Sequence, residues 1–469
     1  MSALGYIFLA FTLLWLIRQF GGDVHSGMCT FLAFVVFMPA MLLIPVPDGF
    51  PQARVHRLLL LVALVFVAKN GYFSGRTDRT PYMRWLVLFG VAQCASLLAG
   101  SYFGAGLSQV IDYAMEVALF FVLMTAYIQR EPQIVTRLIA AVCYALAAVA
   151  VLAALQKYLN FVPVPALIPD ASRAWMEDTD IASTYPHRIL FGYAMAMGTP
   201  IALAFASGIS ERPKRLRMYG IALLLVGGTY LSMSRGPWLG LGIALVAMAA
   251  LGGKALRKKL ALMALLTAVV LIVRPGVRDT ITNLYQETFD EDSQKAGSYQ
   301  TRWELWDVAW TEIRRTPTRF LFGLGPASAE FMDFTGYFEG EGSTSALVKL
   351  GHTSWDNNYA SDLIEFGVVG FTFELILFAS IARALFRNWL RADQDSRALR
   401  AGLGSSCVVF FFAMSNVFIF SPQLTYLFWT IVAIGSNSIW AVNAPVLAEA
   451  DTMAVSGERS ANFSNVPTA

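Results

Sequence analysis

Residues 133–155 read QIVTRLIAAVCYALAAVAVLAAL, and Arg137 is the only charged residue among them. At about 1.5 Å per residue, a helix of this length crosses a hydrocarbon core of about 30 Å. The sequence therefore predicts an all-α integral membrane protein with about 12–13 transmembrane helices. The other candidate spans lie near residues 3–20, 28–45, 56–73, 83–100, 107–128, 189–208, 216–232, 237–252, 257–273, 358–382, 401–420 and 423–441.

The composition supports this class of protein. Of 469 residues, 56% are hydrophobic and 14% are charged, whereas a soluble domain has about 25% charged residues. The four cysteines all fall within apolar runs and lack the spacing of metal ligands, so we expect no structural zinc site. Nothing in the sequence indicates a cofactor or a nucleic-acid partner, and we expect neither.

One long hydrophilic segment, residues 274–357, interrupts the apolar runs, and it has 13 acidic and 8 basic residues. Because it is the largest segment outside the predicted spans, we expect polar chemistry to be housed there. The predicted division is 1–273, with about ten transmembrane helices; 274–357, a large external loop with an amphipathic helix; 358–443, the last three transmembrane helices; and 444–469, a disordered cytoplasmic tail.

The distribution of Lys and Arg predicts which connectors face the cytoplasm. The connectors after the first, third, fifth, seventh, ninth and eleventh spans carry 20 of these residues, whereas the opposite set carries 6 outside the long loop. Short cytoplasmic connectors are enriched in Lys and Arg, and long loops are exempt from this rule. The long loop, the 157–188 loop and the turn at 232–236 are therefore all expected on the external side.

The turn at residues 230–239, YLSMSRGPWL, has the features of an anion site. Arg235 lies in the predicted turn, and Pro237 suits the first turn of a following helix. An arginine binds phosphate oxygens bidentately, and the free N–H groups of a helix start point to the same place. The alternative is an arginine that anchors the chain at the membrane interface.

The loop 157–188 contains two motifs that are candidate binding sites. Asp178-Thr179-Asp180 is similar to the DxD sequence of metal-dependent glycosyl transfer, but short acidic loops produce such triplets by chance, and we expect no metal there. His187 and Arg188 begin the next apolar run. A cation pair at that position suits a diphosphate, and an interfacial anchor is the alternative.

Polar residues also enter the apolar runs. Asn358, Asp362 and Glu365 have the i, i+4 and i+7 spacing of one helix face, which must contact protein or water. Asp356 precedes this helix, either as its N-cap or as a general base. Asp112 and Glu116, within another run, are interpreted as hydrated side chains near the interface.

Three motifs together resemble the O-antigen ligase and polymerase superfamily. They are the Ser-Arg-Gly turn with Arg235 and Leu239, the segment Arg302-Trp303-Glu304-Leu305-Trp306 followed by Thr316-Pro317 and Phe322-Gly323-Leu324-Gly325, and the block Asp356-Asn357-Asn358-Tyr359 with Glu365, Gly367 and Gly370. The resemblance covers roughly residues 185–380. It implies a glycosyltransferase of the bacterial inner membrane that moves glycans from polyprenyl diphosphate at the external face.

The resemblance also suggests roles for the residues. Many members, the ligases especially, have a histidine where this chain has Asp356, and His352 lies one helical turn earlier. The candidate catalytic residues are therefore Asp356, His352 and Glu365. Cations must hold the donor diphosphate, and the candidates are Arg235, Arg302 and Arg188. Trp306, Asn357 and Tyr359 are candidates for acceptor or sugar contacts, and no metal site is expected.

The expected partners are a polyprenyl-diphosphate-linked oligosaccharide donor, a glycan or lipid A core acceptor, the bilayer, a flippase and a chain-length regulator. The aspartate at the histidine position favours a polymerase of exopolysaccharide, capsule or O-antigen units. The alternatives are an O-antigen ligase of lipopolysaccharide synthesis and, in another class, a membrane transporter or flippase. Transporters commonly contain internal repeats, and we find none here.

Overall fold

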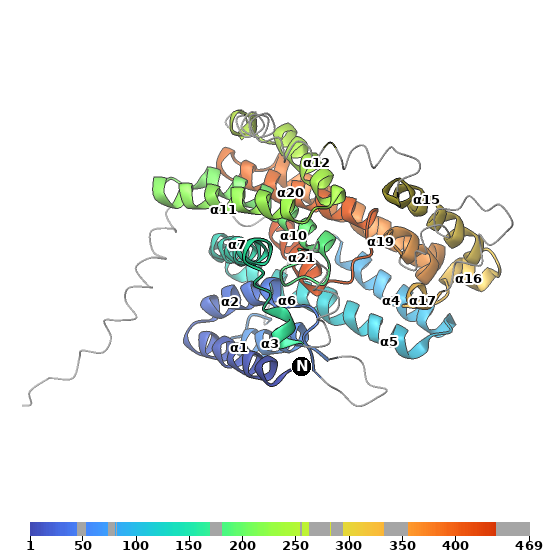
Figure 1. Cartoon of the computed structure of the whole chain (residues 1–469). Helices are drawn as coiled ribbons and strands as arrows, with labels where there is room; N and C mark the ends of the chain where they lie inside the picture. Colours follow the sequence, from blue (N-terminus) through green and yellow to red (C-terminus); the bar gives the residue numbers. More distant parts are fainter. Residues whose placement is uncertain are drawn as a thin grey trace, which may run out of the picture.

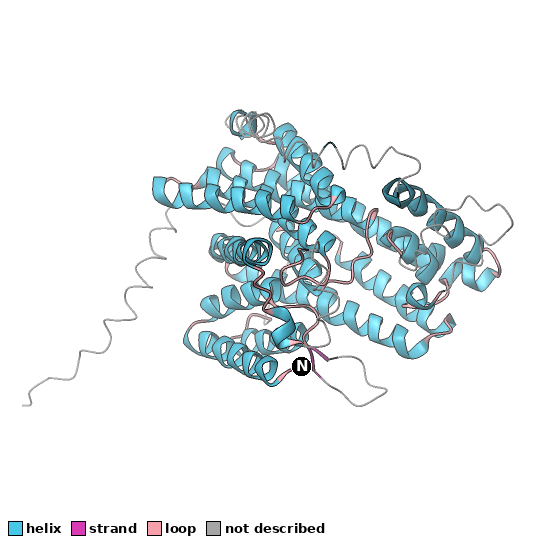
Figure 2. Cartoon of the chain, in the orientation of Figure 1, coloured by secondary structure: helices cyan, strands magenta, loops and turns pink. Residues whose placement is uncertain are grey.

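The computed structural model is built almost entirely from helices (Figure 2). The structure describes residues 1–44, 53–73, 80, 82–168, 181–253, 256–261, 282, 294–332 and 355–437. Within these residues a two-stranded antiparallel sheet joins β1 (Leu43–Ile44) to β2 (Ala53–Arg54), in the register Leu43 to Arg54. The prediction of an all-α membrane protein is confirmed.

The first part of the chain has helices that pack on α2, namely α1, α3 and α7, and a pair of helices away from them, α4 and α5 (Figure 1). Its elements are α1 (Ala3–Gly22), α2 (Val24–Phe37), α3 (Val55–Lys69), α4 (Met83–Ala99), α5 (Phe103–Asp112), the π-helical η1 (Tyr113–Leu119), α6 (Phe120–Arg130), the 3-10 turn η2 (Pro132–Ile134), α7 (Val135–Leu159) and α8 (Val164–Leu167).

The second part contains the long core helices and the external segment. Its elements are α10 (Arg188–Gly208), α11 (Arg212–Leu231), α12 (Arg235–Leu251), α15 (Gln294–Ile313), α16 (Pro317–Phe322), α17 (Ser328–Phe331), α19 (Asn358–Leu390), α20 (Gln394–Met414) and α21 (Pro422–Ser436). Figure 1 shows α15, α16 and α17 together at one end of the molecule, beside the start of α19.

Six helical segments among the described residues are long and apolar enough to cross a membrane by themselves. Three shorter apolar helices, α2, α4 and α12, lie at further predicted spans. The predicted span at 257–273 lies mostly outside the described residues. The six segments are Ala3–Gly22, Phe103–Arg130, Pro132–Leu159, Arg188–Gly208, Asn358–Leu390 and Ser396–Met414.

Two predicted boundaries were wrong. The span expected at 28–45 is α2, which begins at Val24 behind the N-cap Asp23 and ends at Phe37. Pro39 explains the early end, because the residue before a proline is disfavoured in helical conformation. The span expected at 401–420 is α20, which ends at Met414, so residues 415–421 form a non-helical connection to α21.

Helix α10 is the centre of the fold and packs against α7, α11, α12, α20 and α21. It can be surrounded on all sides because small residues let its neighbours approach closely. A Cβ atom on Gly198 would lie 2.5 Å from Leu146 Cδ1, and one on Gly402 of α20 would lie 2.7 Å from the carbonyl oxygen of Pro200. These contacts fix the middle of α10 relative to α7 and α20.

Helix α19 bends at Gly367, where φ is 62° and ψ is −170°. Only glycine adopts this conformation readily. At the bend, the N–H groups of Leu324 and Gly325 donate to the carbonyl oxygens of Ile364 (2.8 Å) and Glu365 (3.1 Å). The external segment is thus joined to α19 by main-chain hydrogen bonds, and a Cβ atom on Gly367 would lie 2.5 Å from Gly323 N.

Candidate functional site

Two of the predicted diphosphate-binding arginines begin neighbouring helices. Arg188 is the first residue of α10, and Arg235 is the first residue of α12, so the predicted start of that helix at Pro237 is wrong by two residues. The two helix starts abut, because a Cβ atom on Gly192 would lie 2.7 Å from Pro237 Cγ. Both arginines are half-buried. Two helix starts therefore lie beside two cations, although at α10 the Ile189 N–H already donates to the N-cap His187 Nδ1 (3.3 Å).

The third arginine, Arg302 of α15, joins the external segment to the core. Its Nε donates to the carbonyl oxygens of Asp356 and Asn416, both at 3.2 Å, and its Nη2 donates to Asn416 at 3.0 Å. Charged groups that donate to carbonyl oxygens form strong hydrogen bonds. Arg302 therefore fixes the entry to α19 against the connection between α20 and α21.

The buried ring of Tyr193 connects these arginine positions. Its ring lies 6.5 Å from that of Phe412, one turn before Asn416. A Cβ atom on Gly236, which follows Arg235, would lie 2.6 Å from the Tyr193 hydroxyl oxygen. Within the described part of the chain this buried hydroxyl has no hydrogen-bond partner. We call Arg188, Arg235, Arg302 and Tyr193 the arginine site.

Asn357 caps α19. Asp356, for which the sequence predicts either an N-cap or a general base, is not the cap. Asn357 Oδ1 accepts from the N–H of Ala360 (3.2 Å), and its Nδ2 donates to the carbonyl oxygen of Arg302 (3.4 Å). Asp356 is half-buried beside the arginine site. His352, the other candidate base, lies outside the described residues, as does the Asp178-Thr179-Asp180 motif.

The residues of the predicted polar stripe on α19 all precede the bend at Gly367, but they have different partners. Asn358 and Asp362 form a hydrogen bond and line a cavity. Glu365 points elsewhere: its Oε2 accepts from Gln109 Nε2 (2.7 Å), and its Oε1 accepts from the N–H of Ala329 (3.4 Å). These contacts tie α5 and α17 to α19, so they favour a positioning role for Glu365.

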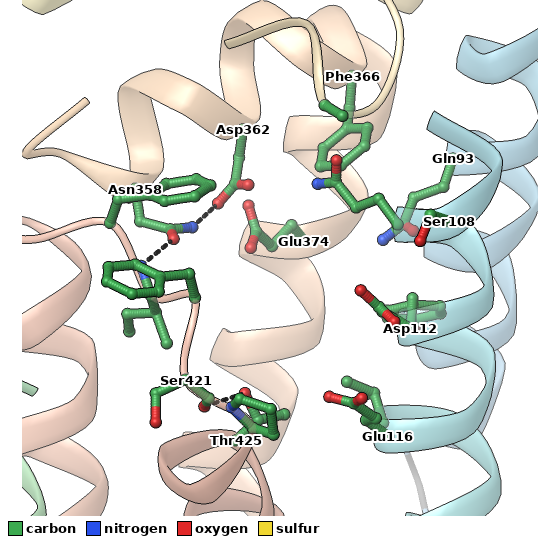
Figure 3. Close-up of a pocket in the computed structure, with 18 of the residues that line it drawn as sticks. Gln93, Ser108, Asp112, Glu116, Asn358, Asp362, Phe366, Glu374, Ser421 and Thr425 are labelled. Atoms are coloured by element: carbon green, nitrogen blue, oxygen red, sulfur yellow. Dashed lines mark hydrogen bonds between the residues drawn. The ribbon is translucent and has the colours of Figure 1, made fainter. Parts of the chain in front are cut away.

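The cavity has a volume of about 650 Å³ and lies between α19 on one side and α4, α5 and η1 on the other (Figure 3). The α20–α21 connection lines it as well. Five carboxylate residues line it, namely Asp112, Glu116, Glu330, Asp362 and Glu374. Glu374 was missed in the sequence, although a carboxylate within an apolar run is a general signal of function.

The carboxylates on η1 and at the end of α5 are paired with arginines. Arg54 Nη1 lies 3.3 Å from Asp112 Oδ2, and Arg57 Nε lies 3.3 Å from Glu116 Oε1. Glu116 is 4% exposed. The interpretation of both residues as hydrated interfacial side chains was therefore wrong for Glu116, which is a buried member of an ion-pair network.

A comparison of the chain with known protein families finds a match to part of it. Residues 220–375 match the family model described as O-antigen ligase. These residues are similar to the O-antigen ligase family, and we call this segment the O-antigen ligase domain. The resemblance inferred from the sequence motifs is thus confirmed, and the domain includes Arg235, Arg302, Asp356 and Glu374. No curated protein matches the chain.

Within the O-antigen ligase domain, the helix in the external segment is α15, which packs against α19. Leu305, Val308, Ala309 and Ile313 are buried in this contact, whereas Trp303 is 60% exposed.

The candidate sugar contacts have structural neighbours as well. The Trp306 ring lies 6.0 Å from that of Phe371 of α19, in an edge-on arrangement. The Tyr359 hydroxyl donates to the carbonyl oxygen of Phe411 of α20 at 3.2 Å. Both side chains hold elements of the O-antigen ligase domain to the core, and their contacts with a glycan stay a prediction.

Proposed function

We propose that this protein is a glycosyltransferase that polymerises glycan repeat units from polyprenyl diphosphate at the periplasmic face of the bacterial inner membrane. The observation that carries the proposal is the arginine site, where Arg188 and Arg235 begin two abutting helices. Cations and helix N–H groups are the donors that bind a diphosphate and stabilise the charge growing on it as it leaves.

In this reaction, the bond between the sugar C1 atom and the diphosphate oxygen breaks, and a bond from C1 to the acceptor hydroxyl oxygen forms. The hydroxyl proton passes to a general base, and polyprenyl diphosphate leaves with the bonding electron pair. Asp356 is the proposed base, with His352 as the alternative. The diphosphate is already an activated leaving group, so the proposal includes no metal ion.

A polymerase is favoured over a ligase because Asp356 stands where many ligases have histidine. A ligase that joins the glycan to lipid A core is the second candidate. A flippase and a chain-length regulator are proposed partners of the polymerase. A transporter is disfavoured because the arginines gather at one end of the fold and not along a path through it.

The testing experiment is an Arg235→Ala variant assayed with a purified polyprenyl-diphosphate-linked repeat unit. Removing one preorganised donor to a developing charge costs about 10²–10³ in rate, and we expect that loss with an unchanged melting temperature. Arg391→Ala is the matched control, because Arg391 is exposed at the opposite end of α19. Equal transfer rates in both variants and the parent protein would refute the diphosphate assignment.

A further inference from the structure

We propose that the acidic cavity beside the arginine site binds a neutral sugar residue of the acceptor glycan. This inference rests on the proposed glycosyltransferase function and adds the class of ligand that the cavity takes. The cavity volume of about 650 Å³ lies in the range of ligand sites, roughly 300–1,000 Å³. Its lining is carboxylate, amide and aromatic, as Figure 3 shows for Asp362, Glu374, Gln93 and Phe366.

The charges of the cavity exclude the diphosphate. On the α5–η1 side, Arg54 and Arg57 neutralise the two carboxylates. On the α19 side, no described Lys or Arg forms a salt bridge with Asp362 or Glu374, whose carboxyl groups point toward each other in Figure 3. Arg54 is the one cation among the described lining residues and is already paired with Asp112, so an anionic ligand in this partly desolvated cavity would find no cation to bind. The diphosphate therefore belongs on the arginine side.

The hydrogen-bonding groups indicate what the ligand must bring. Gln93 Oε1 is a buried acceptor that has no hydrogen-bond partner in the described part of the chain. Gln93 is 3% exposed and lines the cavity. A buried acceptor without a donor is costly, so a fitting ligand supplies hydroxyl donors. A sugar does so, whereas a diphosphate ester and a polyprenyl chain have none to give.

The aromatic lining suits the other surface of a sugar. Phe89, Phe366, Phe418 and Trp429 contribute to the wall, and the Phe89 and Phe366 rings contact each other edge-on at 5.4 Å. The C–H face of a pyranose is apolar and packs against such rings, while its hydroxyls reach the carboxylates. Water has no apolar surface to pack against aromatic rings, so a cavity that held water alone would not need this wall.

The cavity and the arginine site meet along two backbone segments. Asp356 and Asn416 accept from Arg302 through their carbonyl oxygens. Two and three residues further along the chain, Asn358 and Ile419 line the cavity, and the Asn358 side chain accepts from the Ile419 N–H (3.0 Å). A sugar in the cavity would thus lie next to the proposed base, with the donor diphosphate on the far side of these segments.

The experiment uses full-length protein in detergent and three variants: Glu374→Gln, Gln93→Leu and Ser108→Phe, which fills the cavity. The probe is the repeat-unit oligosaccharide freed by mild acid from the polysaccharide of the producing cells. Binding is measured by saturation-transfer NMR without donor, and the KM values for acceptor and donor are measured separately. Ser210→Phe, at an exposed connector, is the matched control for the added ring.

We expect each cavity variant to raise the acceptor KM at least tenfold and to weaken oligosaccharide binding, with an unchanged donor KM and unchanged binding of undecaprenyl diphosphate. A raised donor KM with an unchanged acceptor KM would overturn the proposal, as would parental oligosaccharide binding in all three variants. If one variant fails to fold, the other two carry the test. Failure of the parent protein to bind undecaprenyl diphosphate would count against the glycosyltransferase and leave the oligosaccharide measurement valid.

Discussion

The arginine site and the acidic cavity are neighbours of opposite charge. The arginine site is built from helix starts and guanidinium groups. The cavity is lined by carboxylate residues, and two of them, Asp362 and Glu374, form no salt bridge with a described Lys or Arg. The segments that hold Asp356–Asn358 and Asn416–Ile419 separate the two sites. The difference teaches how two binding sites of a glycosyltransferase can be kept apart by charge. The anionic donor is held at the arginine site and the polyhydroxyl acceptor in the cavity.

The largest effect is expected from Arg302→Ala, because this side chain holds both dividing segments through three hydrogen bonds. Transfer should fall below detection, and the melting temperature should also fall, since each lost charged hydrogen bond contributes about 1.5–3 kcal/mol. Arg302→Lys keeps the charge but cannot reproduce the forked geometry. Transfer at the parental rate in the alanine variant would contradict this account.

The next effect concerns the base at the boundary between the sites. Asp356→Asn should lower the transfer rate by about 10²–10⁴, the contribution of general-base catalysis, with the melting temperature hardly changed. Because Asn357 caps α19, a loss in this variant cannot be attributed to a lost cap. Asp356→His should recover part of the rate. A fully active Asn variant, assayed with purified lipid-linked donor, would move the base to another residue.

A third test compares the two carboxylate walls of the cavity. Glu116→Gln weakens a buried ion pair with Arg57 and should lower the free energy of unfolding by about 1–3 kcal/mol. Glu374→Gln removes no described salt bridge and should leave stability nearly unchanged. Thermal melts of the two variants, measured side by side in one detergent, separate these outcomes. Equal destabilisation would show that both walls are structural.

A fourth test concerns the bend of α19 at Gly367. Gly367→Ala places a side chain where only glycine fits, at a cost of about 1–3 kcal/mol for the backbone conformation alone. Melting temperature and proteolysis of the external segment should both report its release from α19. Gly404→Ala is the control, because its Cβ atom would meet nothing within 4 Å. A stable Gly367→Ala protein would count against the docking.

The smallest effect is expected at Trp303, which is 60% exposed on α15. Substitution by alanine should change stability by less than about 0.5 kcal/mol, as at other surface positions. If the sugar chain extends over this helix, the acceptor KM will rise while the maximal rate stays constant. A change in the maximal rate would instead place Trp303 within the catalytic site.

Hydropathy and spacing predicted the helices well, because the length of an apolar run is a local property. Side-chain direction was less accessible. Asp356, Asn357 and Asn358 are all good N-caps, and only the extended backbone of Asn357 decides among them. The helical spacing placed Glu365 with Asp362, but the partners of Glu365 are Gln109 and Ala329, which come from segments far away in the sequence. Arg57 and Glu116 are 59 residues apart, so no local pattern shows their pairing.

The bend at Gly367 has a consequence for how this enzyme class could diversify. The external segment is fastened there by the N–H groups of Leu324 and Gly325, and both Gly323 and Gly325 have positive φ. The residues that follow Gly325 and precede Asp356 can therefore be exchanged for those of a relative while the fastening and the proposed base stay in place. A graft of that stretch should transfer the glycan preference of the relative while the rest of the fold stays the same.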